Sequence, residues 1–190
     1  MRIAKYLGIA SAALVLSFSA MAQNAQQSTN LVAANAVLQT KIDAKTAKAG
    51  DPVTAKLTSS VHLPGGTELP RNTLLTGHID QAQAAVNDGV STVVLTFDKA
   101  QPKGGQAIAI KSTIVGIYPS GTGLIPPDLN PQLKIEQEPT SAHGYSLTSD
   151  VQGSNSAVLK ADGKNVRIGD GAELQFAVAP IAASSAASGN

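Results

Sequence analysis

Few of the side chains that commonly do chemistry in proteins occur in this sequence at a spacing that would let them act together. The histidines are His62, His78 and His143. No two of them have the His-x-x-x-His spacing that places two metal ligands on one face of a helix. Because His62 and His78 lie on or beside predicted strands, we expect structural or solvated histidines there.

The candidate nucleophile and the candidate acid–base residues also lack partners. Ser91 lies in the run GVSTV, which lacks the second glycine of a nucleophile elbow. Asp80 and Asp98 lie at the ends of predicted strands, and neither has a second carboxylate placed to pair with it in acid–base chemistry. Convergence of His78, Asp80 and Asp98 in the folded chain is the observation that would favour an enzyme.

Two glycine-containing segments are equally poor candidates for ligand binding. Gly169-Asp170-Gly171 is too short for a calcium loop, and Gly121-Thr122-Gly123 lacks the strand-to-helix context of a phosphate loop. The chain has no cysteine, which excludes thiol catalysis, thiolate zinc sites and disulfides. We therefore predict a protein that is not an enzyme, with no catalytic, cofactor-binding or metal-binding residues.

The elements that would position these side chains are strands. Short segments alternate between apolar and polar residues with the period of two that is typical of half-buried strands. The predicted strands span residues 36–42, 52–58, 73–83 with an interruption at Gly77, 90–97, 107–118, 157–160, 165–168 and 172–178. About eight short strands separated by turns indicate an all-β barrel or sandwich. We expect its core to contain Val53, Leu57, Leu75, Val94, Phe97, Ile108, Ile110, Ile114 and Leu174.

The connections between the predicted strands have turn chemistry. Asn87-Asp88-Gly89 tolerates the positive φ of a tight hairpin, and the glycines at 104, 105, 163, 169 and 171 act similarly. Helix signals are weak, and residues 43–48 would make one helical turn at most. The exception is a long connection, residues 119–142, which contains five prolines and is too long for an ordinary loop. Its leucines and isoleucines favour a surface loop that docks partly on the barrel.

The first 22 residues predict export. Arg2 and Lys5 precede the apolar run 7–18, and Ala20-Met21-Ala22 supplies the small residues that signal peptidase needs. The apolar run is shorter than the roughly 20 residues that span a bilayer. We expect cleavage between Ala22 and Gln23 and a periplasmic or secreted mature chain without a transmembrane helix. Residues 23–35 are expected to form a flexible leader, 36–179 the barrel domain, and 180–190 a disordered tail.

The composition of the mature chain argues against nucleic acid as a partner. Loss of Arg2 and Lys5 reduces the basic residues from 14 to 12, against 13 acidic residues, for a net charge of −1. Such a chain lacks the basic footprint of a nucleic-acid-binding protein. Aromatic residues make up 3% of the sequence, which disfavours sites that stack planar ligands.

Three stretches of the chain resemble a known family. The residues GDPVTA at 50–55, LPRNTLLTG at 69–77 and VRIGDGAEL at 166–174 are similar to the C-terminal β-barrel domain of the TrbI-like conjugal-transfer proteins of type IV secretion. The resemblance covers roughly residues 36–178 with gaps. It implies a barrel in which Pro70 fixes a turn, Asn72 or Thr73 accepts backbone hydrogen bonds, and Gly77 lets a strand bend.

The chain departs from that family at two places. A cleavable signal replaces the family's inner-membrane helix and proline-rich spacer, and residues 119–142 hold too many prolines for the helical hairpin of channel-forming members. We therefore expect an exported β-barrel with an envelope-structural or protein-interaction role and envelope or secretion-system proteins as partners. A periplasmic module that binds a small ligand or polymer, and an enzyme of unknown class, remain the alternatives.

Overall fold

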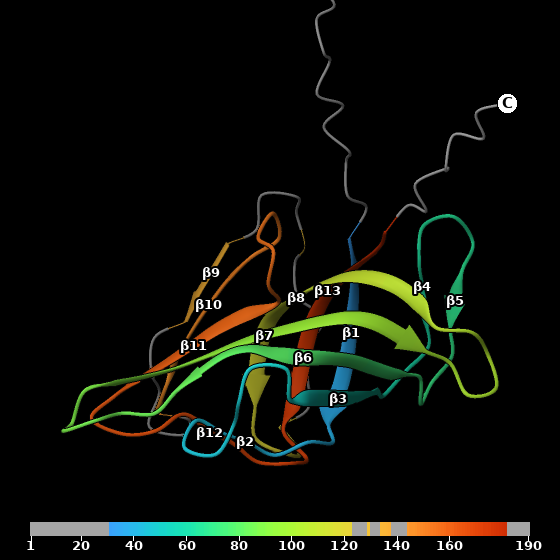
Figure 1. Cartoon of the computed structure of the whole chain (residues 1–190). Helices are drawn as coiled ribbons and strands as arrows, with labels where there is room; N and C mark the ends of the chain where they lie inside the picture. The colour runs from blue at the N-terminus through green and yellow to red at the C-terminus, as the bar shows by residue number, and fades with distance from the viewer. Residues whose placement is uncertain (1–30, 123–128, 130–133, 138–143, 182–190) are drawn as a thin grey trace, which may run out of the picture.

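In the computed structural model, the chain is all-β and forms a closed six-stranded barrel with further strands attached (Figure 1). The structure describes residues 31–122, 129, 134–137 and 144–181. No residue within these ranges lies in a helix. The strands are β1 (Val32–Leu38), β2 (Ile42–Asp43), β3 (Pro52–Leu57), β4 (Val61–His62), β5 (Glu68–Leu69), β6 (Leu74–Gln83), β7 (Val90–Gln101), β8 (Ile108–Tyr118), β9 (Lys134–Gln137), β10 (Ser146–Asp150), β11 (Ala157–Asp162), β12 (Arg167–Ile168) and β13 (Glu173–Pro180).

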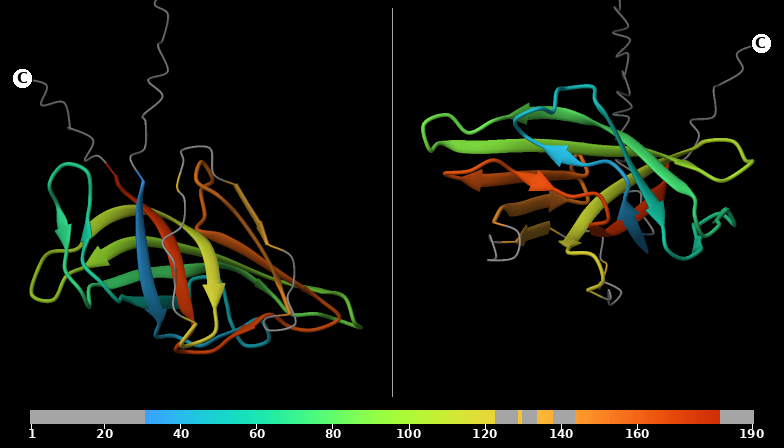
Figure 2. Two further views of the ribbon diagram at one scale, coloured as in Figure 1. Left: turned by 180° about the vertical axis from the view of Figure 1, so that it is seen from behind. Right: turned by 90° about the horizontal axis from the view of Figure 1, so that it is seen from below.

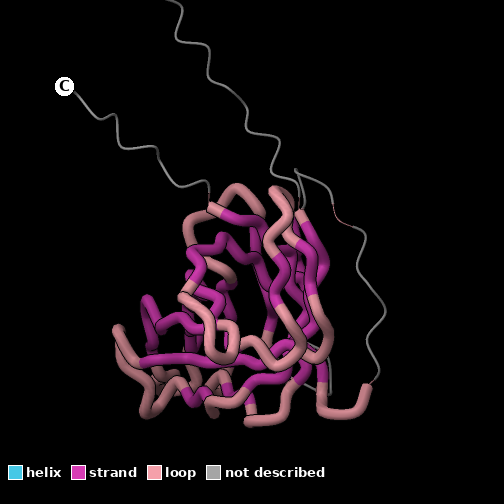
Figure 3. The backbone as a smooth tube through the Cα atoms, turned by 90° about the vertical axis from the view of Figure 1, so that its right-hand side faces the viewer, coloured by secondary structure: helices cyan, strands magenta, loops and turns pink. Residues whose placement is uncertain are grey.

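The barrel closes through the pairing of β6 with β7. Its strand order is β6-β3-β1-β13-β8-β7, and every pair in it is antiparallel. Figures 2 and 3 show these strands curving around a common interior. β1 and β13 are neighbours, with Val32 opposite Val178, so the first and last strands of the described chain lie side by side.

The sheet branches at β7. One side of β7 pairs with β6 along most of its length. On the other side, Lys99 and Ala100 pair with the start of β8, whereas residues 90–95 pair with β11. β11, β10 and β9 then extend the sheet beyond the barrel.

The side chains at alternate positions of each strand point inward and fill the barrel. In β3, Val53, Ala55 and Leu57 are buried while the residues between them face outward. The rings of Phe97 on β7 and Phe176 on β13 pack edge to face with centroids 5.3 Å apart. The interior of a barrel with so few strands is just wide enough for such side chains, and here it is a packed apolar core.

Most of the predicted core residues are confirmed as buried: Val53, Leu57, Leu75, Phe97, Ile110, Ile114 and Leu174. The prediction is wrong for Val94, because Val93 and Leu95 occupy the inward positions of β7 and leave Val94 partly exposed. Ile108 is only partly buried, although it packs against the core.

The strand bounds also differ from the expected ones. β1 begins at Val32, before the expected domain boundary at residue 36, because Ala34 already alternates inward with Ala36 and Leu38. β9 lies within the long connection, between Pro131 and Pro139, where we expected no strand, and β4, β5 and β10 were not predicted either. Residues 43–48 form hydrogen-bonded turns, in which Thr46 and Ala47 donate to the Asp43 carbonyl oxygen.

Candidate functional site

His78 and Asp80 converge with Thr96 on the outer surface of the barrel. The Nε2 atom of His78 lies 2.9 Å from Oδ1 of Asp80, and the Thr96 hydroxyl donates to Oδ2 of Asp80 at 2.6 Å. The side chains of His78 and Asp80 are 43% and 33% exposed, so the pair is open to solvent. We call these three residues the His78 cluster.

Two β-bulges place the acidic residues. In the pairing of β6 with β7, His78 lies opposite Thr96, and Asp80 is the extra residue where the register shifts after Ile79. Asp98 is the extra residue of a second shift, on β7 between Phe97, which pairs with Gly77, and Lys99, which pairs with Thr76. Asp98 makes no hydrogen bond or ion pair with His78 or Asp80 in the described part of the chain, so the three predicted candidates converge only in part.

The His78 cluster can hold a histidine in one tautomer. With Nε2–H donated to Oδ1 of Asp80, the ring carries its lone pair on Nδ1, and the Thr96 hydroxyl donates to the other oxygen of the same carboxylate. A histidine oriented in this way is able to accept a proton or ligate a metal. Among the described residues, however, no three histidine, aspartate or glutamate side chains form a group that could hold a metal ion.

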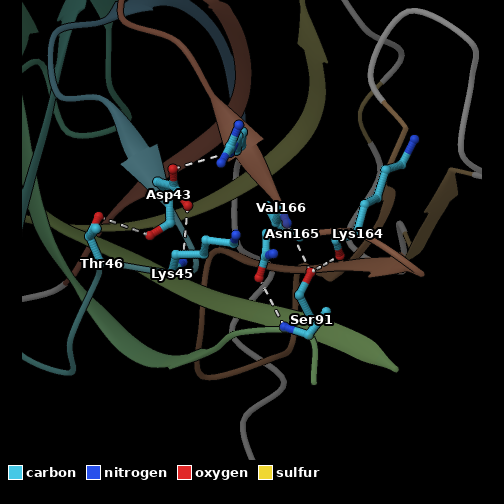
Figure 4. A network of polar contacts seen from close by, with 9 residues as sticks. Asp43, Lys45, Thr46, Ser91, Lys164, Asn165 and Val166 are labelled. Atoms are coloured by element: carbon cyan, nitrogen blue, oxygen red, sulfur yellow. Dashed lines mark hydrogen bonds and ion pairs between the residues drawn. The ribbon is translucent and has the colours of Figure 1, made fainter. Parts of the chain in front are cut away.

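Ser91 has a structural role. It is fully buried, its hydroxyl donates to the Lys164 carbonyl oxygen at 2.9 Å, and it accepts the Val166 N–H at 2.8 Å (Figure 4). Nearby, Oδ1 of Asn165 accepts the Ala85 N–H at 2.9 Å. These bonds hold the β6–β7 hairpin against the turn between β11 and β12, and they leave the Ser91 hydroxyl without the exposure that a nucleophile needs.

The remaining candidates lie in turns or at the surface. His62 faces Glu68 across the β4–β5 hairpin at 3.8 Å, and its side chain is 77% exposed. Gly171 has a φ of 85°, and the Ala172 N–H donates to the Gly169 carbonyl oxygen, so residues 169–171 lie in a turn between β12 and β13. Gly121 donates its N–H to the Glu173 carboxylate at 2.8 Å. His143 and Gly123 lie outside the described residues.

The turn after β5 has the geometry that the motif LPRNT predicts, with one correction. Asn72 has a φ of 70°, in the left-handed region. Thr73 is buried and donates both its N–H and its hydroxyl to the Pro70 carbonyl oxygen, at 3.1 and 2.7 Å. The Thr73 side chain therefore donates a hydrogen bond, whereas we expected Asn72 or Thr73 to accept backbone hydrogen bonds.

The outer face of β8 and β13 is the second notable surface. A small apolar cluster of Val115, Val151 and Ala177 lies there, and Leu129 and Ile135 of the long connection pack against it. Consequently most of the central residues of β8 and β13 are buried on both faces of the sheet. The described part of the connection is thus docked on the barrel.

Thr96 and the packing partners of the connection were not predicted from the sequence. The spacing of His78 and Asp80 was an available signal, because residues two apart on a strand share a face. Thr96 had no such signal, since its position opposite His78 depends on the register between β6 and β7.

Comparisons of the chain with protein families, with curated proteins and with solved structures found no match. Within the described ranges, the fold contains no helix of the length and apolarity that a membrane crossing requires.

Proposed function

We propose that this chain is an exported, non-enzymatic β-barrel that acts through its outer surface, in an envelope-structural or protein-interaction role like that of the TrbI-like barrel it resembles. The observation that carries the proposal is the docking of the long connection on the outside of a barrel whose interior is filled. Because apolar side chains fill the barrel interior, a partner would have to bind to the outer surface of the barrel. Long loops on rigid scaffolds commonly carry the contacts of such proteins.

The docked side chains explain how the connection would be held ready for a partner. Leu129 and Ile135 anchor it on Val115, Val151 and Ala177, so part of it has a fixed position on the barrel before any partner arrives. Anchoring of this kind lowers the ordering cost of binding. The proposed partners are envelope or secretion-system proteins, in line with the predicted signal peptide.

The proposal is tested by replacing residues 121–131 with a glycine-serine segment of the same length. In one variant Leu129 is kept, and in a second it is replaced as well. The variant that keeps Leu129 should fold with nearly wild-type stability and lose the envelope proteins that co-purify with the exported chain.

The second variant and a Leu129→Ala chain measure the docking contact itself. Each should lower the free energy of unfolding by about 1–2 kcal/mol, because a partly buried leucine contributes less than the range found for fully buried ones. Recovery of the same envelope proteins with the substituted connection would refute the contact role, whatever the change in stability.

An enzyme is the second candidate, and the contact between His78 and Asp80 favours it. A general base contributes about a hundredfold or more to a rate. Any hydrolysis of chromogenic ester or glycoside substrates by the purified chain should therefore fall at least a hundredfold in His78→Ala and survive in His62→Ala. Equal rates in the two variants would remove the His78 cluster from consideration.

A further inference from the structure

Among the described strands, β9 is the terminal strand of the nine-stranded sheet, because β6 at the other end pairs with β7 and closes the barrel. Each of the other eight strands has hydrogen-bonded neighbours on two sides, whereas β9 pairs only with β10. In the described part of the chain, nothing pairs with the outer edge of β9. An unpaired edge presents a row of N–H and C=O groups that can accept another strand.

The side chains of β9 show which strand would fit. Lys134 and Glu136 are exposed on one face, and Ile135 between them is partly buried against the apolar cores. An antiparallel copy of this strand, centred on Ile135, would place each Lys134 opposite the Glu136 of the other copy. Opposite charges in directly facing positions stabilise a strand pair, and like charges destabilise it.

We propose that β9 pairs with β9 of a second copy of this chain, giving a two-fold symmetric dimer with a sheet that runs through both copies. Ile135 lies opposite Ile135 on the inner face, and two Lys134–Glu136 pairs lie on the outer face. The row of side chains continues inward to Asp150, whose Oδ2 atom lies 3.7 Å from Nζ of Lys134. Along that row the charges alternate from Asp150 to Lys134 to the Glu136 of the other copy.

The pairing has a preferred direction and a modest strength. Parallel pairing in register would bring Lys134 against Lys134 and Glu136 against Glu136, so the charges select the antiparallel arrangement. Because β9 has four residues, the contact is at the small end of specific interfaces, and the dimer should be weak and dependent on concentration. This inference is independent of the envelope role proposed above, since it needs only the purified chain.

The test is the molar mass in solution, measured by sedimentation from micromolar to millimolar concentration. The wild-type chain should pass from monomer to dimer. Glu136→Lys and Lys134→Glu should each raise the dimer dissociation constant at least tenfold, because each puts like charges opposite one another. An equimolar mixture of the two variants should dimerise again, since a strand with two lysines then faces a strand with two glutamates.

Lys160→Glu on β11 is the matched control, because it makes the same charge change at an exposed position on a strand paired on both sides. It should dimerise like the wild type. Hydrogen exchange of the wild-type chain gives a readout without substitution, in which protection of the amides of residues 134–137 rises with concentration. A wild-type chain that stays monomeric at millimolar concentration, unchanged protection, or a mixture that fails to associate would each overturn the proposal.

Discussion

At Gly77 the backbones of β6 and β7 approach so closely that a side chain has no room. A Cβ atom there would overlap the Thr96 carbonyl oxygen and lie 2.6 Å from the Cα atom of Phe97. We expect Gly77→Ala to lower the free energy of unfolding by about 3 kcal/mol or more, since both obstacles are backbone atoms that cannot rotate away.

Gly169→Ala is the control for this change. No atom lies within 4 Å of its Cβ position, so its effect should stay within about 0.5 kcal/mol of zero. Chemical denaturation of the two variants provides the comparison. Similar midpoints for both would show that β6 and β7 do not approach each other at Gly77 as described.

Tyr145 gives the stability of the fold a dependence on high pH. Burial raises the pKa of its hydroxyl from 10.0 to about 12, and the residue is 6% exposed. The unfolded chain therefore loses this proton at a lower pH than the folded chain. The free energy of unfolding is therefore unaffected by this ionisation below about pH 10. It falls by about 2–3 kcal/mol as the pH rises from 10 toward 12.

Thermal unfolding measured between pH 9 and pH 12 checks the sign of this effect. The melting temperature of the wild-type chain should fall more steeply with pH than that of Tyr145→Phe, which has no proton to lose. Parallel curves for the two chains would mean that Tyr145 ionises equally in both states.

The branch of the sheet at β7 depends on two buried serines. Ser156 accepts the Phe97 N–H at 2.9 Å, and the Ser112 hydroxyl donates to the Phe97 carbonyl oxygen at 2.8 Å. The two hydroxyl oxygens are 2.9 Å apart, so Ser156 donates to Ser112 and completes a ring of hydrogen bonds. The ring satisfies the backbone of Phe97 at the point where β7 leaves β8 and joins β11.

Ser156→Ala should therefore cost about 1–3 kcal/mol, the usual penalty for an unsatisfied buried donor. Ser154→Ala, in the same turn but exposed, should be close to neutral. Equilibrium unfolding in urea distinguishes the two variants. A neutral result at Ser156 would indicate that another group or a water accepts the Phe97 N–H.

The elements show where a sequence is informative and where it is not. Alternation located the barrel strands because each has one face in a common core, and the asparagine and aspartate of the β6–β7 turn revealed its positive φ values of 48° and 59°. The extension was harder to predict, because β9 is short and lies between prolines. The register between β6 and β7, which forms the His78 cluster, depends on two bulges. Gly77 is a local signal for the first bulge, whereas no local pattern encodes the second one at Asp80.

For the molecule as a whole, we expect a large contribution to stability from Phe97 and Phe176, which pack against each other in the barrel core. Phe97→Ala should lower the free energy of unfolding by about 3–5 kcal/mol, because it empties a fully buried aromatic site. Val94→Ala on the same strand should cost less than about 1.5 kcal/mol, since Val94 faces outward. A change below about 1 kcal/mol at Phe97, measured by denaturation, would contradict the packing of the barrel centre.

The pairing of β1 with β13 also sets the order of events during biosynthesis. Of the described strands, β1 is translated first, yet its neighbour β13 is translated last. Ala34, Ala36 and Leu38 cannot be enclosed in the barrel until β13 is available. Contacts between such distant segments form slowly. The barrel therefore cannot close around these residues until β13, near the end of the described chain, has been made.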